Sequence, residues 1–482
     1  MSGRVRLVAL TLAALLVGTA VGLLAGLRGP ALGTTAAGDP GLAADVRASL
    51  TSDRGLSSVS AARVRAGETS FAGLGTTDGD HVPGPDTPYE LGSITKTFTA
   101  ALLADAVTRG EVRLDDPVAT FLPELEDTPA GERTLRELAT HTAGLPPFPS
   151  ASAPLVAVRV VGNDNPYAGS VADLLVATRT TEVEAPGTYR YSNLGMALLG
   201  HALARAAEVP GWPDLLRARL LDPLGMRSTV VVEEPGQVPD GTARPHHDNG
   251  WPGPVWSGPA FAPAGSSTVT TAADLARWAG ALLDGSAPGS AALDPLVDIP
   301  GGRVGLAWHV REVTGRTVTW HNGGTGGTRT ILALDRERGQ AVLLLTDSAR
   351  DLDVVGLRLA AADPGAPVAA VAGRDVGLAG LLGWNVVGLL LLGTAVLRWR
   401  GGRGWALVDG ALAAATGLLV LLVHGPWQLV PTALWVGLTL AVGVLGVAAS
   451  LRRGGPRTAS RTGLVTSLAG TAVVLAIAVW SL

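Results

Sequence analysis

The sequence predicts a mixed α/β (α+β) fold: an antiparallel sheet flanked by helices, with a helical subdomain, followed by a C-terminal four-helix transmembrane region. Short runs of alternating or apolar residues with turn signals occur at 59–75 and return at 305–345. The region between these runs shows helical periodicity broken by proline and glycine. Strands at both ends of a helix-rich domain favour one sheet, which the first and last strands close by pairing.

Each element of this domain follows from a local pattern. Residues 59–75 alternate valine, arginine and phenylalanine between glycines, and predict a hairpin of edge strands. A helix that starts at Ser93 carries apolar residues at helical spacing and should be buried in the domain centre. A last helix is expected near 351–361. The terminal strands are predicted at 305–310, 317–321 and 341–345.

Composition limits the classes of function. The chain has 482 residues, a net charge of −4 and no cysteine. The small net charge does not favour nucleic acid as a partner. The lack of cysteine excludes disulfides, thiol catalysis and cysteine metal sites. Hydrophobic residues make up 47% of the chain and charged residues 16%, and this apolar excess lies at the two ends, which indicates membrane spans.

The N-terminal end predicts export. Arg4 and Arg6 precede a run of apolar and small residues, so we interpret residues 1–28 as a signal peptide or a signal anchor. The sequence leaves these two alternatives open. A linker at 29–44 leads into the main domain at 45–365, which is therefore expected to be extracytoplasmic.

The C-terminal end predicts a multi-pass protein of the cell membrane, with the lipid bilayer as a partner. After a linker at 366–375, residues 376–482 are expected to form four transmembrane helices, at 376–397, 405–423, 429–451 and 463–482. Arginines lie between the first two segments and between the last two, which places both loops in the cytoplasm by the positive-inside rule. Asp409, within the second segment, is interpreted as a partner of Arg403.

A serine and a lysine three positions apart form the chemical centre of the sequence. At helical spacing, Ser93 and Lys96 lie on one face, one turn apart. Lys96 is the only lysine of the chain, in which arginine otherwise supplies the cationic side chains. A buried lysine can lose its proton, whereas arginine keeps it. Since a neighbouring amine helps to remove the proton of a serine hydroxyl, the pattern predicts a nucleophile.

Two further motifs follow in a fixed order. They are Tyr191-Ser192-Asn193 and His321-Asn322-Gly323. With these three motifs, the sequence over roughly 45–365 resembles the serine β-lactamase and penicillin-binding-protein-like family. The resemblance is strongest to the branch of class C β-lactamases, D-alanyl-D-alanine carboxypeptidases and related esterases, and it implies the fold of serine β-lactamases for the main domain.

The resemblance also implies roles around the nucleophile. Tyr191 would be the second member of the proton relay, and its phenol and the Lys96 amine are expected to titrate as a coupled pair. A nearby cation would stabilise the phenolate. Asn193 would orient the substrate amide and Lys96. The oxyanion hole would use the backbone N–H groups of Ser93 and Gly324.

The third motif departs from the family pattern. His321 stands where the family carries a lysine, and imidazole would supply a hydrogen bond or a titratable positive charge for a substrate carboxylate. Gly323 would let the substrate backbone approach the strand closely. The departure favours peptidase-like or esterase-like chemistry over efficient hydrolysis of β-lactam antibiotics.

Other conspicuous residues are given structural interpretations. His141 is interpreted as a structural histidine at a helix end rather than a base. Tyr189 is expected to line the cleft. The cluster His246-His247-Asp248 lies in a loop rich in proline and glycine, and is interpreted as solvated rather than metal-binding. No metal and no cofactor is expected.

The leading functional hypothesis is an exported, membrane-attached serine hydrolase that forms an acyl-enzyme on Ser93. Its substrate would be a peptide, an amide or an ester, and its activity would resemble that of a D-alanyl peptidase or an esterase. A peptide substrate could come from the cell wall. The first alternative is a non-catalytic or slow-turnover sensor of cell-wall fragments or β-lactams, and the second is a β-lactamase. A transporter with an appended domain is disfavoured, because the apolar segments carry few charges.

Overall fold

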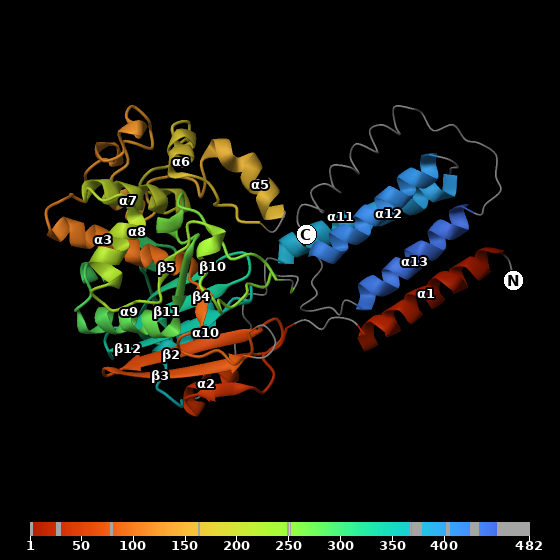
Figure 1. The fold of residues 1–482 in the computed structure, drawn as a ribbon, viewed down its shortest axis with the longest axis horizontal. Helices are drawn as coiled ribbons and strands as arrows, with labels where there is room; N and C mark the ends of the chain where they lie inside the picture. The colour runs from red at the N-terminus through yellow and green to blue at the C-terminus, as the bar shows by residue number, and fades with distance from the viewer. Residues whose placement is uncertain are drawn as a thin grey trace.

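The computed structural model describes residues 3–25, 30–77, 81–161, 164–247, 250, 252–366, 368, 378–401, 405–424 and 433–450 (Figure 1). Within these residues, a nine-stranded antiparallel sheet has the order β1-β3-β2-β12-β11-β10-β9-β8-β7, and a second sheet has the order β4-β6-β5. The strands are β1 (Ala36–Gly38), β2 (Ser58–Arg65), β3 (Glu68–Gly75), β4 (Pro88–Glu90), β5 (Val230–Val231), β6 (Thr268–Thr271), β7 (Val297–Ile299), β8 (Gly302–Val304), β9 (His309–Val313), β10 (Arg316–Gly324), β11 (Arg329–Asp335) and β12 (Gln340–Thr346).

Helices cover both faces of the large sheet. Figure 1 shows α3, α7 and α8 on one side of the sheet and α2 on the other. The described helices are α1 (Gly3–Ala25), α2 (Pro40–Ser49), α3 (Thr95–Thr108), α4 (Leu135–Ala139), α5 (Ala153–Val161), α6 (Val171–Thr178), α7 (Asn193–Ala206), α8 (Trp212–Leu216), α9 (Ala272–Asp284), α10 (Asp353–Ala361), α11 (Leu378–Gly401), α12 (Trp405–His424) and α13 (Ala433–Ser450).

The central strands are apolar on both faces because two cores enclose them. Along β12, Leu343 and Leu345 belong to the core that α3, α7 and α9 cover. Val342 and Leu344, which point to the opposite face, belong to the core beneath α2 and α10. This double burial explains why β12 is a continuous apolar run instead of the alternation typical of a sheet with one solvated face.

The predicted closure of the sheet is confirmed, with two local corrections. The first hairpin joins the last strands, because β2 pairs with β12. The hairpin is not at the edge, however: β2 lies between β3 and β12, and the edges are β1 and β7. The strand expected at 305–310 is mostly absent, because residues 305–308 connect β8, which ends at Val304, to β9, which begins at His309. Burial on both faces, which a local pattern does not report, accounts for the first correction.

The prediction of a C-terminal four-helix transmembrane region is wrong for the part of the chain that the structure describes. A span needs about 20 consecutive, predominantly apolar residues. No helix in the described ranges combines the length and the apolar character needed to cross a bilayer. The segment at 463–482, Arg403 and the side chain of Asp409 lie outside the described residues.

Candidate active site

The nucleophile stands at the start of a buried helix. A tight turn at Gly92–Ile94 carries Ser93 and leads directly into α3. Phe98 and Leu102, one turn apart on α3, are both buried, as their helical spacing predicts. Phe98 also meets Trp278 of α9 edge-on, with ring centroids 5.4 Å apart. The packing of α3 in the domain centre holds Ser93 at a rigid position.

The lysine of the first motif is buried against the nucleophile. Lys96 is 0% exposed. Its Nζ donates hydrogen bonds to Ser93 Oγ at 2.8 Å and to the carbonyl oxygen of Ala264 at 2.6 Å. Burial lowers the pKa of Lys96 well below the ordinary value of an amine. Burial thus favours the neutral amine, which is the form that can accept the proton of Ser93.

The structure brings Tyr191 to the same point from a distant segment. Tyr191 precedes α7, whose first turn is capped by the Ser192 hydroxyl bound to the N–H of Gly195 at 2.9 Å. Lys96 Nζ lies 5.0 Å from the centre of the Tyr191 ring. Burial raises the pKa of Tyr191, and a hydrogen bond with Ser93 acts in the opposite direction. Burial therefore disfavours the charged forms of both Lys96 and Tyr191, and it acts against the cation-stabilised phenolate that the resemblance implies.

Asn193 lies in a small pocket together with Ser93 and Gly324. Its Nδ2 donates a hydrogen bond to Tyr167 Oη at 2.6 Å. Burial raises the pKa of Tyr167 to about 12, so this phenol remains protonated near neutral pH. The residue predicted to orient the substrate amide is therefore placed at the wall of the pocket that contains Ser93.

An aromatic wall of this pocket was missed by sequence reasoning. Tyr167 stacks on Phe148 with ring centroids 4.6 Å apart. It also approaches Trp256 and Phe261, at 5.5 Å and 5.1 Å between centroids. Aromatic residues make up only 4% of the chain, and this rarity is the one sequence signal that could have drawn attention to them. Their gathering depends on three loops that are distant in sequence.

Glycines let the backbone pack closely on the other side of Ser93. Gly92 has φ of +63°, a left-handed conformation that glycine adopts readily. A methyl group built on Gly92 would overlap the backbone nitrogen of Gly324. A methyl group on Gly323 would overlap the carbonyl oxygen of Leu91. The predicted oxyanion donors, the N–H groups of Ser93 and Gly324, thus belong to segments in direct backbone contact.

His321 lies beside this centre but in a different state from the one expected. It is 0% exposed, and its ring centre is 6.4 Å from that of Tyr191. Its Nδ1 donates a hydrogen bond to the carbonyl oxygen of Asn322 at 2.6 Å. Burial, reinforced by the positive charges that His309 and Lys96 carry when protonated, lowers the pKa of His321 well below its usual range. A neutral imidazole is therefore favoured near pH 7, which leaves the hydrogen bond, and not the positive charge, of the two roles suggested by the sequence.

Two further histidines, His141 and His309, contact residues in or beside the second and third motifs. His141 Nδ1 accepts a hydrogen bond from the N–H of Ser192 at 3.2 Å, and its ring lies 4.5 Å from that of Tyr191. This contact is in line with the structural role given to His141. Tyr189 Oη pairs with His309 Nε2 at 2.9 Å. His309 was not singled out from the sequence, because nothing local marks it.

The structure offers no support for a metal centre in the parts of the chain it describes. His247 Nδ1 donates to the carbonyl oxygen of Gly326 at 3.0 Å, and His246 Nδ1 donates to that of Asp347 at 3.1 Å. Both histidines of the loop cluster therefore bind backbone. Asp248, the third member, lies outside the described residues.

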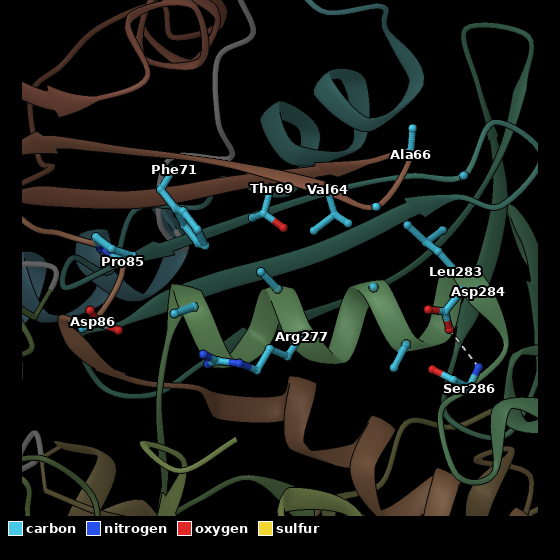
Figure 2. A pocket seen from close by; sticks show the side chains of 16 residues that line it. Val64, Ala66, Thr69, Phe71, Pro85, Asp86, Arg277, Leu283, Asp284 and Ser286 are labelled. Carbon is cyan, nitrogen blue, oxygen red and sulfur yellow. Dashed lines mark hydrogen bonds between the residues drawn. The ribbon is translucent and has the colours of Figure 1, made fainter. Parts of the chain in front are cut away.

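A groove larger than the pocket around Ser93 lies elsewhere on the domain. Figure 2 shows it between helix α9, which carries Arg277 and Asp284, and the β2–β3 hairpin, which contributes Val64, Thr69 and Phe71. None of the residues singled out for catalysis lines this groove. Its size is therefore no guide to the chemistry, which the side chains around Ser93 locate instead.

Comparisons with known proteins identify relatives of the domain that contains Ser93. The family model described as Beta-lactamase matches residues 34–364. A curated relative, unguisins hydrolase ungD' of Aspergillus campestris, is 26% identical over 309 residues, which are 57% of this chain and 55% of the relative. A beta-lactamase of Escherichia coli K12 is 35% identical over 153 residues, covering 31% of this chain and 37% of the relative.

A solved structure shows the same fold. The beta-lactamase/D-alanine carboxypeptidase of Pseudomonas syringae is 23% identical, with a TM-score of 0.55 and coverage of 64% of this chain and 93% of that chain. This chain spans about half the length, or less, of the curated relatives described above.

Proposed function

This chain belongs to the beta-lactamase family, and from that premise we propose that it is a serine hydrolase that forms an acyl-enzyme on Ser93. The observation that carries the proposal is the fully buried Lys96 amine, whose pKa burial lowers and which is hydrogen-bonded to Ser93 Oγ at 2.8 Å. A free serine hydroxyl is a weak nucleophile, and an adjacent base with a lowered pKa activates it. The substrate class is a peptide, an amide or an ester.

In the proposed reaction, Ser93 Oγ attacks the carbonyl carbon while its proton passes to the Lys96 amine, which becomes an ammonium ion. The oxyanion accepts hydrogen bonds from the N–H groups of Ser93 and Gly324. As the bond to the leaving group breaks, Tyr191 donates its proton to the departing atom and regains one from Lys96. Water then cleaves the ester, which releases a carboxylic acid and restores Ser93.

The residues that line the pocket around Ser93 are uncharged, which suits the amide or ester group itself. Asn193 offers an amide for orientation, and Tyr167 and Trp256 offer aromatic surface. Neutral His321 lacks the fixed charge that would bind the carboxylate of a β-lactam. We therefore expect small esters or peptides to be hydrolysed faster than cephalosporins. The curated relative named as a hydrolase supports hydrolytic chemistry. The extracytoplasmic location of the domain stays a prediction.

Intact-mass analysis of the full chain tests the function. The protein is mixed with p-nitrophenyl acetate, a D-alanyl-D-alanine peptide or benzylpenicillin, and sampled over time. We expect a covalent adduct on Ser93 with at least one compound and none with Ser93→Ala. An adduct of equal yield on Ser93→Ala would contradict the proposal. An adduct that persists without product release would favour the slow-turnover sensor over the hydrolase.

A further inference from the structure

A carboxyl group lies buried three residues before the nucleophile. Glu90 is the last residue of strand β4, and it is 2% exposed. Burial raises the pKa of Glu90 to about 7, and hydrogen bonds act in the opposite direction. A buried polar group in a protein needs partners, and a fully buried carboxyl group is unusual unless it is paired. The hydrogen-bond partners of Glu90 therefore indicate the role of its carboxyl group.

The partners come from two loops that reach the active site. Glu90 Oε1 accepts a hydrogen bond from the backbone N–H of Trp256 at 2.7 Å. Glu90 Oε2 pairs with Thr325 Oγ1 at 2.7 Å and with Thr328 Oγ1 at 3.2 Å. One side chain thus joins strand β4, the loop that carries Trp256 and the turn between β10 and β11.

Both loops form the pocket around Ser93. Trp256 and Gly324 line it, and Thr325 follows Gly324 directly. The turn is closed by a backbone hydrogen bond from Thr325 N to Thr328 O at 3.1 Å. Arg329 Nη1 donates to the carbonyl oxygens of Thr325 and Thr328, each at 2.8 Å. Arg329 secures the shape of the turn, whereas Glu90 secures its position relative to the nucleophile segment.

We propose that Glu90 is a positioning residue that holds the turn from Gly324 to Thr328, together with Trp256, in register with Ser93. This inference rests on the proposed function, because it assigns Glu90 to the oxyanion side of that site. Oxyanion donors act only when they are placed within hydrogen-bond distance of the developing charge. A turn that shifts loses this placement even when Ser93, Lys96 and Tyr191 keep theirs.

The chemistry of the contact predicts which substitution is tolerated. Glutamine keeps a carbonyl oxygen that accepts from the N–H of Trp256, and its amide donates to a threonine hydroxyl oxygen. Leucine fills similar space but offers neither group, so it leaves the Trp256 N–H unpartnered. Glu90→Gln should therefore rescue what Glu90→Leu loses. If Glu90 only stabilised the core, its loss would lower the stability of the fold without slowing the acylation step at saturating substrate.

The test measures single-turnover acylation of the full chain by p-nitrophenyl acetate. We expect Glu90→Leu to acylate about 10- to 100-fold more slowly, with the half-saturating ester concentration little changed, since removing one oxyanion donor costs about 100- to 1,000-fold. Glu90→Gln should stay within about threefold of the wild type. The matched control is Gln340→Leu, because Gln340 is also buried and binds the carbonyl oxygens of Ala360 and Ala362 at the end of α10. It should lower the melting temperature and leave acylation unchanged.

Hydrogen exchange of the amides in residues 324–328 gives a second readout that needs no activity. Glu90→Leu should speed exchange in this turn, whereas Gln340→Leu should not. Thr325→Val, which removes one partner and keeps the volume, should show the same effect if Glu90→Leu does not fold. Wild-type acylation and unchanged exchange in Glu90→Leu or Thr325→Val would overturn the inference. If the wild type forms no adduct, the proposed function fails, and exchange alone decides the role of Glu90.

Discussion

The two sides of Ser93 are built by different means. On the proton-transfer side, two side chains meet the hydroxyl: Lys96 Nζ donates to it at 2.8 Å, and Tyr191 forms a hydrogen bond with it. On the oxyanion side, the backbone of the Gly92 turn packs directly against the backbone of Gly324, and a methyl group on Gly92 would overlap Gly324. The first side is specified by residue type and pKa, whereas the second is specified by close packing and by a carboxyl group outside every motif.

This difference predicts different responses to mutation. Changes on the proton-transfer side should reduce the rate while the fold is kept, because the residues involved act through proton affinity. Changes on the oxyanion side should affect stability and rate together, because the backbone there has no free space. The four experiments below test the distinction, in order of decreasing effect.

Lys96→Arg should give the largest loss on the proton-transfer side. Guanidinium keeps its proton and is too broad for a buried site beside Ser93, so it cannot act as a base. Losing a proton-transfer role typically lowers the rate by about two to four orders of magnitude. We expect the variant to fold, as judged by circular dichroism and melting, and to label with a fluorophosphonate probe far more slowly than the wild type. A folded variant that labels at the wild-type rate would disprove the assignment of Lys96.

Tyr191→Phe should lower acylation by about 100-fold, because the ring is kept and the proton donor is removed. The matched control is Tyr189→Phe, two residues away. Tyr189 pairs with His309 rather than with Ser93, so its loss should change the rate by less than about threefold. Single-turnover kinetics with an ester distinguish the two. Equal effects of the two substitutions would remove the special role of Tyr191.

Gly92→Ala should lower stability and rate together. Its positive φ costs about 1–3 kcal/mol for an alanine, and the overlap with Gly324 adds to this. The control is Gly67→Ala, because Gly67 has φ of +80° but open space around the added methyl group. Urea unfolding should show a larger loss for Gly92→Ala, and only this variant should acylate slowly. If both variants keep the wild-type rate, close packing on the oxyanion side has no catalytic role.

The smallest effect is a change in the pH dependence of stability. Glu90 has a folded pKa of about 7 against an ordinary value of 4.5, so the folded state holds its proton more tightly. Its contribution is fully present below pH 4.5 and is lost as the pH rises through 7, by up to about 3 kcal/mol. Arg329 and His247 contact the same turn as Glu90, and burial raises the pKa of Asp353 to about 7 as well.

The measurement is therefore a difference between the wild type and Glu90→Gln. Urea unfolding at pH 5 and at pH 8 should show that the glutamine variant loses less stability over this interval. Asp353 and the histidines contribute equally to both proteins, so they cancel in the comparison. Identical slopes would show that Glu90 does not titrate in this interval.

The sequence by itself predicted the residues of the candidate site. Ser93 and Lys96 are one helical turn apart, so their contact is local, and the order of the three motifs indicated the family that the comparisons show. Pairing of the first and last strands also followed from local patterns. The apolar C-terminal segments did not determine a transmembrane region, which the described helices do not support.

Only the tertiary structure decided the electrostatic state of the site and its oxyanion side. The lowered pKa values of Lys96 and His321 result from burial, which depends on elements distant in sequence. Tyr167 joins the pocket and Glu90 meets Thr325 for the same reason, since each contact spans more than 25 positions. A local pattern records residue type and spacing, whereas desolvation and close backbone contact are set by how the whole chain packs.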